Sequence, residues 1–76
     1  MYSHIISDPT ILGGKPCIEG TRLSVEFILE LFASGAERQD ILRAYPQLTD
    51  DSIQDVLKYA AASVKNEIVL MDRIAA

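Results

Sequence analysis

The sequence predicts a mainly α-helical domain in which three helices follow an extended N-terminal arm. Apolar residues recur at helical spacing through residues 25–64, and residues typical of helix ends interrupt them. Short apolar stretches separated by proline and glycine come before them, a pattern typical of strands and turns. We therefore expect a single domain, residues 1–76, with an extended β arm at 1–23, a three-helix bundle at 24–65 and a C-terminal tail at 66–76.

The N-terminal arm is expected to be a β-strand or hairpin. Residues 5–6 (Ile-Ile) and 10–12 (Thr-Ile-Leu) form two short, largely apolar stretches. A turn signal follows each of them, Asp8-Pro9 after the first and Gly13-Gly14 after the second. Polar and apolar residues alternate over residues 16–25, which predicts an extended strand or one arm of a wide hairpin. The glycines of residues 13–20 allow positive φ angles. We interpret this stretch as an element of shape.

The first helix is predicted at residues 25–34. Ser24 comes before it as N-cap, because its hydroxyl can accept a hydrogen bond from a backbone N–H of the first turn. Gly35 follows it and can take the left-handed conformation that ends many helices. The predicted apolar face consists of Val25, Ile28, Leu29 and Phe32.

The second and third helices are predicted on either side of a short proline-containing link. The second occupies residues 37–45 and is ended by Pro46. The third begins after Thr49 as N-cap and keeps its helical spacing as far as Val64. The pair has the length and spacing of a helix-turn-helix, although any small helical bundle contains such a pair.

A series of short motifs marks the chain. They are an Asp-Pro turn, a Gly-Gly-Lys-Pro segment, a Gly-Thr-Arg triplet, a glycine between helices, a Tyr-Pro-x-Leu-Thr turn and a Tyr-Ala-Ala helix end. In this sequence they occupy Asp8 and Pro9, residues 13–16, 20–22, Gly35, residues 45–49 and 59–61. In this order, and up to about residue 62, they resemble the prokaryotic family called domain of unknown function four-three-three. The resemblance implies a homeodomain-like three-helix fold and an antitoxin whose toxin is a PIN-like ribonuclease.

The residues offer no constellation for catalysis, a cofactor or a metal. A phosphate-binding loop needs a helix to begin after Lys15, but Pro16 follows and has no N–H. A Cys17 nucleophile needs a base, and the only histidine is His4, so we interpret Cys17 as a small packed apolar group. One histidine and one cysteine are too few for a zinc site. We therefore expect a protein that is not an enzyme and has no cofactor.

Charge and hydropathy narrow the class of partner. The formal net charge is −4 and the pI is near 4.7, which opposes non-specific attraction to nucleic acid or anionic lipid. No apolar run approaches the ~18 residues of a membrane span. A single cysteine suits a reducing compartment. We expect a cytoplasmic protein with no membrane association.

The start of the third helix separates two candidate functions. A helix-turn-helix protein reads bases with the beginning of its second helix, amid basic residues that neutralise phosphates. Here Asp50, Asp51 and Asp55 occupy that region and would repel DNA. If DNA is bound, as by a stand-alone homodimeric regulator, the residues better suited to contact it are Lys15, Arg22, Arg38 and Arg43.

The function that we favour from the sequence is an antitoxin that binds and inhibits a small basic ribonuclease and that, as a dimer, binds operator DNA more weakly. The same three aspartates would complement a basic surface. An apolar tail would add contact area, although core packing or a dimer contact explains it equally well. The tail residues concerned are Ile68, Val69, Leu70 and Met71. A dimeric scaffold of unknown ligand remains an alternative.

A homodimer is expected from the arm. A two-stranded ribbon is marginally stable alone, and its unpaired edges favour pairing with a second copy. Such pairing about a two-fold axis is expected to bury Ile5, Ile6, Ile11 and Ile18.

Overall fold

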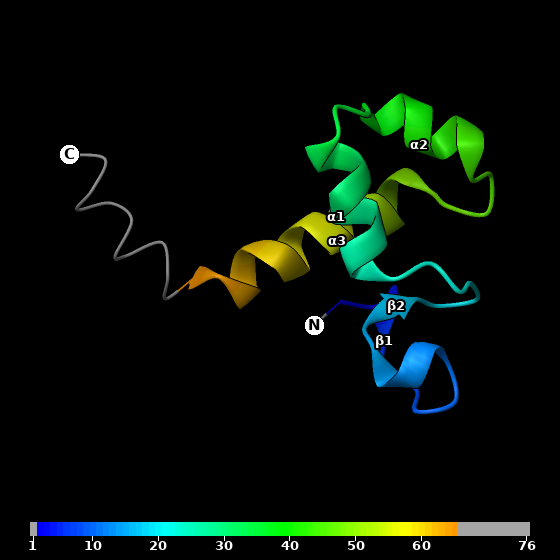
Figure 1. The fold of residues 1–76 in the computed structure, drawn as a ribbon, viewed down its shortest axis with the longest axis vertical. Helices are drawn as coiled ribbons and strands as arrows, with labels where there is room; N and C mark the ends of the chain where they lie inside the picture. The colour runs from blue at the N-terminus through cyan, green and yellow to red at the C-terminus, as the bar shows by residue number, and fades with distance from the viewer. Residues whose placement is uncertain (1, 66–76) are drawn as a thin grey trace.

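The computed structural model describes residues 2–65 and contains a small hairpin followed by three helices. The elements are β1 (Ile5–Ile6), a 3-10 turn η1 (Leu12–Gly14), β2 (Cys17–Ile18), α1 (Val25–Ala33), α2 (Arg38–Ala44) and α3 (Asp50–Ser63). Figure 1 shows α1 crossing α3, with α2 on one side of this crossing and the hairpin on the other. The mainly helical fold with an N-terminal strand arm is therefore confirmed. Among residues 2–65, no helix is both long and apolar enough to cross a bilayer.

The hairpin is shorter and tighter than the sequence predicts. β1 and β2 are antiparallel, with Ile5 opposite Ile18. The chain turns directly after Ile18. The Ile18 N–H donates to the carbonyl of Leu23 at 3.0 Å, and Gly20 within this turn has a φ of 82°. Of the two expectations for residues 16–25, the continuous extended strand is therefore wrong, while the hairpin arm is confirmed by the pairing of β2 with β1. The glycine permits a turn that ends the strand after two residues.

The strand expected at residues 10–12 is also wrong, since Thr10 lies in a turn and the 3-10 turn begins at Leu12. The Asp8 carboxylate accepts hydrogen bonds from the N–H of Thr10 at 2.9 Å and from its hydroxyl at 2.7 Å. Residues 12–14 have positive φ angles of 54°, 65° and 89°. Local turn chemistry therefore overrides the short apolar pattern.

The helix ends are fixed by the expected caps. The Ser24 hydroxyl accepts from the N–H of Phe27 at 2.9 Å, and the Thr49 hydroxyl accepts from the N–H of Ser52 at 3.1 Å. Gly35 follows α1 with a φ of 103°. Compared with the prediction, α1 ends one residue earlier and α2 is one residue shorter at each end.

The positive φ of Gly35 predicts that a residue with a side chain at this position destabilises the domain. We expect Gly35→Ala to lower the free energy of unfolding by on the order of 1 kcal/mol, because a Cβ is strained at this φ. Apart from the chain neighbours, no atom lies within 4 Å of the place that this Cβ would take, so strain rather than collision is the cause. Thermal unfolding should show a midpoint lower by about 4–8 °C. Gly35→Asn should lose less, and equal loss in both variants would contradict the explanation.

The core lies where the helices meet β2. Its buried members are Ile18, Val25, Ile28, Ile41, Leu48, Ile53 and Val56. Ile18 is only 3% exposed within one chain, and Ile5 packs against this cluster. Ile18 is therefore covered within one chain without the expected pairing of two arms, whereas Ile5 is only partly buried. The homodimer itself stays a prediction.

The N-terminal arm is fastened to α3. The His4 Nδ1–H donates to Asp55 Oδ2 at 2.7 Å, and the His4 backbone N–H donates to the same oxygen at 3.2 Å. The ring of Tyr2 stacks edge-on against that of Tyr59, with centroids 5.7 Å apart. The arm is thus packed onto the last helix, 51 residues further along the chain.

Candidate functional site

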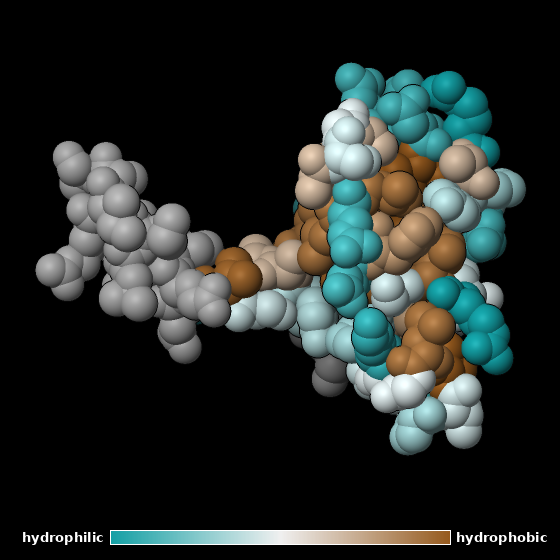
Figure 2. All heavy atoms as spheres, in the orientation of Figure 1, coloured by the Kyte–Doolittle hydropathy of each residue, from teal (hydrophilic) through white to brown (hydrophobic). Residues whose placement is uncertain are grey.

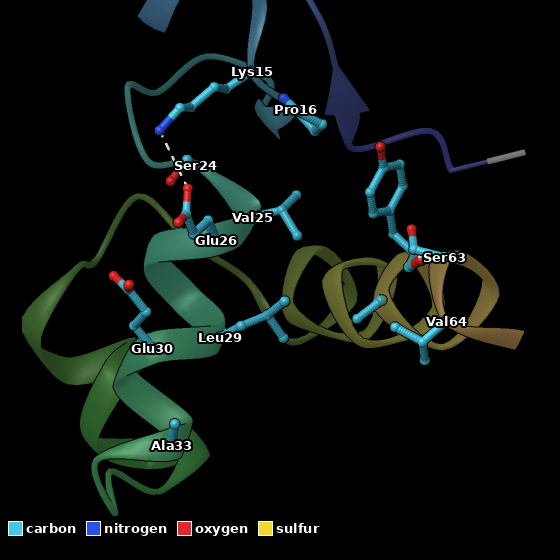
Figure 3. Close-up of a pocket in the computed structure, with 12 residues that line it drawn as sticks. Lys15, Pro16, Ser24, Val25, Glu26, Leu29, Glu30, Ala33, Ser63 and Val64 are labelled. Carbon is cyan, nitrogen blue, oxygen red and sulfur yellow. Dashed lines mark hydrogen bonds and ion pairs between the residues drawn. The ribbon is translucent and has the colours of Figure 1, made fainter. Parts of the chain in front are cut away.

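An apolar groove runs between α1 and the C-terminal half of α3. Its volume is about 580 Å³. Figure 3 shows Val25 and Leu29 of α1 pointing toward α3, where Val64 lies at the far edge. The small residues Ala33 and Ala60 complete the apolar lining. The result is an open trough with two helical walls.

The groove exists because α3 extends past the point at which α1 crosses it (Figure 1). α3 has 14 residues and α1 has 9, which correspond to about 21 and 14 Å of helix. The apolar stripe of α3 therefore continues where α1 no longer covers it, and Val64 is 41% exposed. Figure 1 shows α3 extending away from the rest of the domain, and Figure 2 shows hydrophobic side chains continuing from the body onto it.

The rim of the groove carries more negative than positive charge. Lys15 Nζ lies 3.2 Å from Glu26 Oε1, and both side chains are largely exposed. Glu30 is exposed one turn further along α1, and within residues 2–65 it makes no ion pair. Lys15, a predicted DNA contact, is therefore partly neutralised by Glu26. Glu30 is the remaining charged group, so the rim has a net negative charge.

Arg38 and Asp50, which the sequence assigns to opposite functions, lie beside each other. Arg38 Nη1 is 3.4 Å from Asp50 Oδ1, and Arg38 Nη2 donates to Gln54 Oε1 at 3.0 Å. The guanidinium thus spans the first turn of α3 from α2. A predicted DNA contact is in this way engaged by the acidic helix that would oppose DNA.

The other two predicted DNA contacts, Arg43 and Arg22, take no part in the pair between Arg38 and Asp50. Arg43 is on α2, with Nη2 4.0 Å from Asp40 Oδ1 in the preceding turn. Arg22 is exposed in the turn after β2, and no ion pair engages it among the described residues. Of the four basic residues, three lie beside a carboxylate.

The acidic residues of α3 divide between two surfaces. Asp50 is 73% exposed at the start of α3, and Asp51 beside it is also exposed. The side chain of Asp55 is only 15% exposed and accepts from His4. That hydrogen bond holds the pKa of Asp55 below its ordinary value of 3.8. The expectation that Asp55 shares an open surface with the other two is therefore corrected, because its carboxylate is used within the chain.

Residues with the potential for chemistry are dispersed. Among residues 2–65, no three His, Cys, Asp or Glu side chains are grouped as metal ligands. Cys17 is completely buried, which confirms its interpretation as a packed apolar group. The predicted partner contacts Ile68, Val69, Leu70 and Met71 lie outside the described residues.

The sequence reasoning missed the groove and the contact between His4 and Asp55. The groove could have been found, since the apolar spacing of the third helix continues to Val64 while the first helix ends before Gly35. No periodicity links a histidine in the arm to an aspartate on the third helix. Only the folded arrangement brings that pair together.

Within residues 2–65 the arrangement defines a class of small domain, in which three helices follow an N-terminal antiparallel hairpin that is packed onto α3. The chain belongs to the family described as "Protein of unknown function (DUF433)", whose profile matches residues 5–60. The resemblance carried by the short motifs is thereby confirmed.

Two relatives place the chain among longer proteins. It is 36% identical over 59 residues to "Uncharacterized protein y4eO" of Sinorhizobium fredii (strain NBRC 101917 / NGR234), covering 78% of this chain and 27% of that protein. It is also similar to the crystal structure of a DUF433 member from Anabaena variabilis ATCC 29413. There the TM-score is 0.73 at 26% identity, with 92% of this chain and 65% of that chain covered. The chain thus spans about a quarter of the curated relative.

Proposed function

We propose that this domain is a non-catalytic, protein-binding regulatory module of the antitoxin kind. Its partner would be a small basic ribonuclease of PIN-like type. The observation that carries the proposal is the exposed carboxylate of Asp51 at the start of α3, which makes no ion pair among residues 2–65. Asp50 beside it is 73% exposed, although Arg38 lies 3.4 Å away. A ribonuclease holds the RNA backbone with basic residues, so a surface that presents carboxylates can occupy the same site by complementary charge.

The charge distribution favours a protein partner over DNA. Lys15, Arg38 and Arg43 each lie beside a carboxylate, so phosphate contacts by these residues would compete with existing ion pairs. The first turn of α3, which would enter the major groove in a helix-turn-helix protein, presents carboxylates instead. Operator binding by a homodimer is therefore treated as the competing outcome of the test.

The proposal requires a small basic nuclease encoded beside this gene, and it predicts that Asp51→Lys slows association with that nuclease. We expect the association rate constant to fall roughly threefold to tenfold at low salt, because steering by opposite charge is weakened. Stopped-flow fluorescence at several salt concentrations would measure it. Glu19→Lys is the matched control, since Glu19 is exposed in the turn after β2 rather than at the start of α3, and the change in net charge is the same.

Cleavage of RNA by that nuclease, with and without a saturating amount of the domain, tests inhibition directly. Unchanged cleavage, or an adjacent reading frame that encodes no nuclease, would contradict the proposal. The DNA-binding alternative makes the opposite prediction for the same variant. Asp51→Lys would then strengthen binding to promoter duplex and steepen its dependence on salt.

A further inference from the structure

We propose that the groove between α1 and α3 binds an amphipathic helix of a partner protein, with a lysine or arginine flanking its apolar face. This inference rests on the proposed function, because it names a second surface through which a protein partner is held. The groove lies at the C-terminal end of α3, whereas the exposed carboxylates Asp50 and Asp51 lie at its beginning. The two surfaces can therefore be tested separately.

The lining of the groove suits a helix. Val25 and Leu29 are one helical turn apart on α1, and Val64 faces them from the far edge (Figure 3). Ala33 and Ala60 lack bulk, so a third helix can approach the two walls closely. Helix recognition of this kind uses apolar anchors at successive turns placed into an apolar trough.

A small polar ligand fits the groove less well. Such ligands are oriented by a few converging polar groups inside a largely enclosed pocket. Here most of the groove surface is apolar, and the charged groups lie on its rim. The uncharged polar residues of the lining are Ser24, Ser63 and Tyr59, and both serine hydroxyls already form hydrogen bonds with backbone groups. Among residues 2–65, every buried side-chain nitrogen and oxygen already has a hydrogen-bond partner. No buried donor or acceptor is therefore left to orient a polar ligand.

The negative charge of the rim favours a partner helix that carries positive charge. The Lys15 ammonium is already paired with Glu26 at 3.2 Å. Glu30 stands beside this pair on the exposed edge of α1 and, in the described part of the chain, has no cation of its own. A basic residue on the bound helix would pair with Glu30, while an acidic residue there would be repelled. The groove thus favours the basic surface that the proposed partner carries.

Two synthetic amphipathic peptides test the inference with the full chain. One combines a leucine face with lysines, and the other replaces each lysine by glutamate. In methyl NMR titrations we expect the lysine peptide to shift the signals of Val25, Leu29 and Val64. The glutamate peptide should bind at least tenfold more weakly, since like charges then meet on the rim. No shift at these methyls, or equal binding of both peptides, would overturn the inference.

Two variants distinguish the effect of the charge on the groove rim from the effect of the chain's net charge on peptide binding. Glu30→Lys should abolish or reverse the preference for the lysine peptide, because its own rim then becomes positive. Glu19→Lys changes the net charge equally but lies outside the groove, so it should keep the preference. Loss of the preference in both variants would mean that only overall charge is sensed, and the inference would fail. Circular dichroism would verify that both variants remain folded.

Other occupants would be recognised in the same experiment. Nuclear Overhauser contacts between residues 68–71 and Leu29 in the free chain would assign the groove to the chain's own tail and overturn the inference. A dimer mass in light scattering that Leu29→Glu reduces to a monomer mass would assign it to a second copy, with the same consequence. The peptides involve no nuclease, so their failure leaves the test of inhibition untouched. Conversely, selective peptide binding without inhibition supports the groove and contradicts the proposed function.

Discussion

The Ile53→Ala variant is expected to lose about 3 kcal/mol of its free energy of unfolding, within the 2–5 kcal/mol range for such core truncations. Ile53 is completely buried on α3 and belongs to the cluster that joins all three helices to β2. Alanine would remove apolar contacts with several elements at once and leave a cavity. A domain of this length has only about 4–11 kcal/mol of stability in total. The variant would therefore lose a large fraction of it.

Urea unfolding followed by circular dichroism would measure this loss. The matched control is Val64→Ala at the C-cap of the same helix, because it also shortens a β-branched residue to alanine. Val64 is 41% exposed, so its truncation should change the free energy of unfolding by no more than about 0.5 kcal/mol. Similar losses in the two variants would show that the core is not centred on Ile53.

The second large effect is expected in acid, where the contact between His4 and Asp55 should fail. Its hydrogen bond lowers the pKa of Asp55 below 3.8 in the folded chain. The folded state therefore binds the proton less readily than the unfolded state does. The resulting stability is present above about pH 4 and is lost as the pH falls through the lowered pKa. Asp8 acts in the same direction, because the N–H of Thr10 lowers its pKa.

Asp55→Asn isolates the contribution of that one carboxylate. We expect the variant to be less stable than the natural chain at pH 7, and the two stabilities to converge on acidification. Urea unfolding at half-unit steps from pH 7 to pH 2.5 would give both curves. Asp51→Asn is the control, because Asp51 is exposed and makes no contact with the arm. Parallel curves for the natural chain and Asp55→Asn would rule out a titrating contact to His4.

The helices could be predicted because their signals are local. Ser24 and Thr49 cap the turns that directly follow them, and Gly35 takes the positive φ that ends α1. The arm was predicted less accurately, since its short apolar stretches lack a period long enough to separate strand from turn. The hydrogen bonds from Thr10 to Asp8 decide that question locally, and they favour a turn.

The candidate site was predicted in part, since it depends on distances between elements. The exposed start of α3 follows from the position of its cap. The pairing of Arg38 with Asp50 does not, because it requires the angle at which α2 meets α3. The same is true of Asp55, which the sequence places with the other aspartates and the fold turns toward His4. Side-chain partners far apart in sequence are fixed by packing, which a single sequence does not reveal.

The attachment of the arm to α3 has a consequence for the order of synthesis and folding. His4 and Asp55 are 51 residues apart, so at about 5–20 residues per second the ribosome adds the aspartate roughly 3–10 s after the histidine. During that interval the strand β1 has been made, but the helix that anchors it has not. The earliest part of this domain to be translated is therefore among the last to reach its native contacts. Residues 5–18 can pair as a hairpin earlier, but the docking of the arm onto α3 has to wait for that helix.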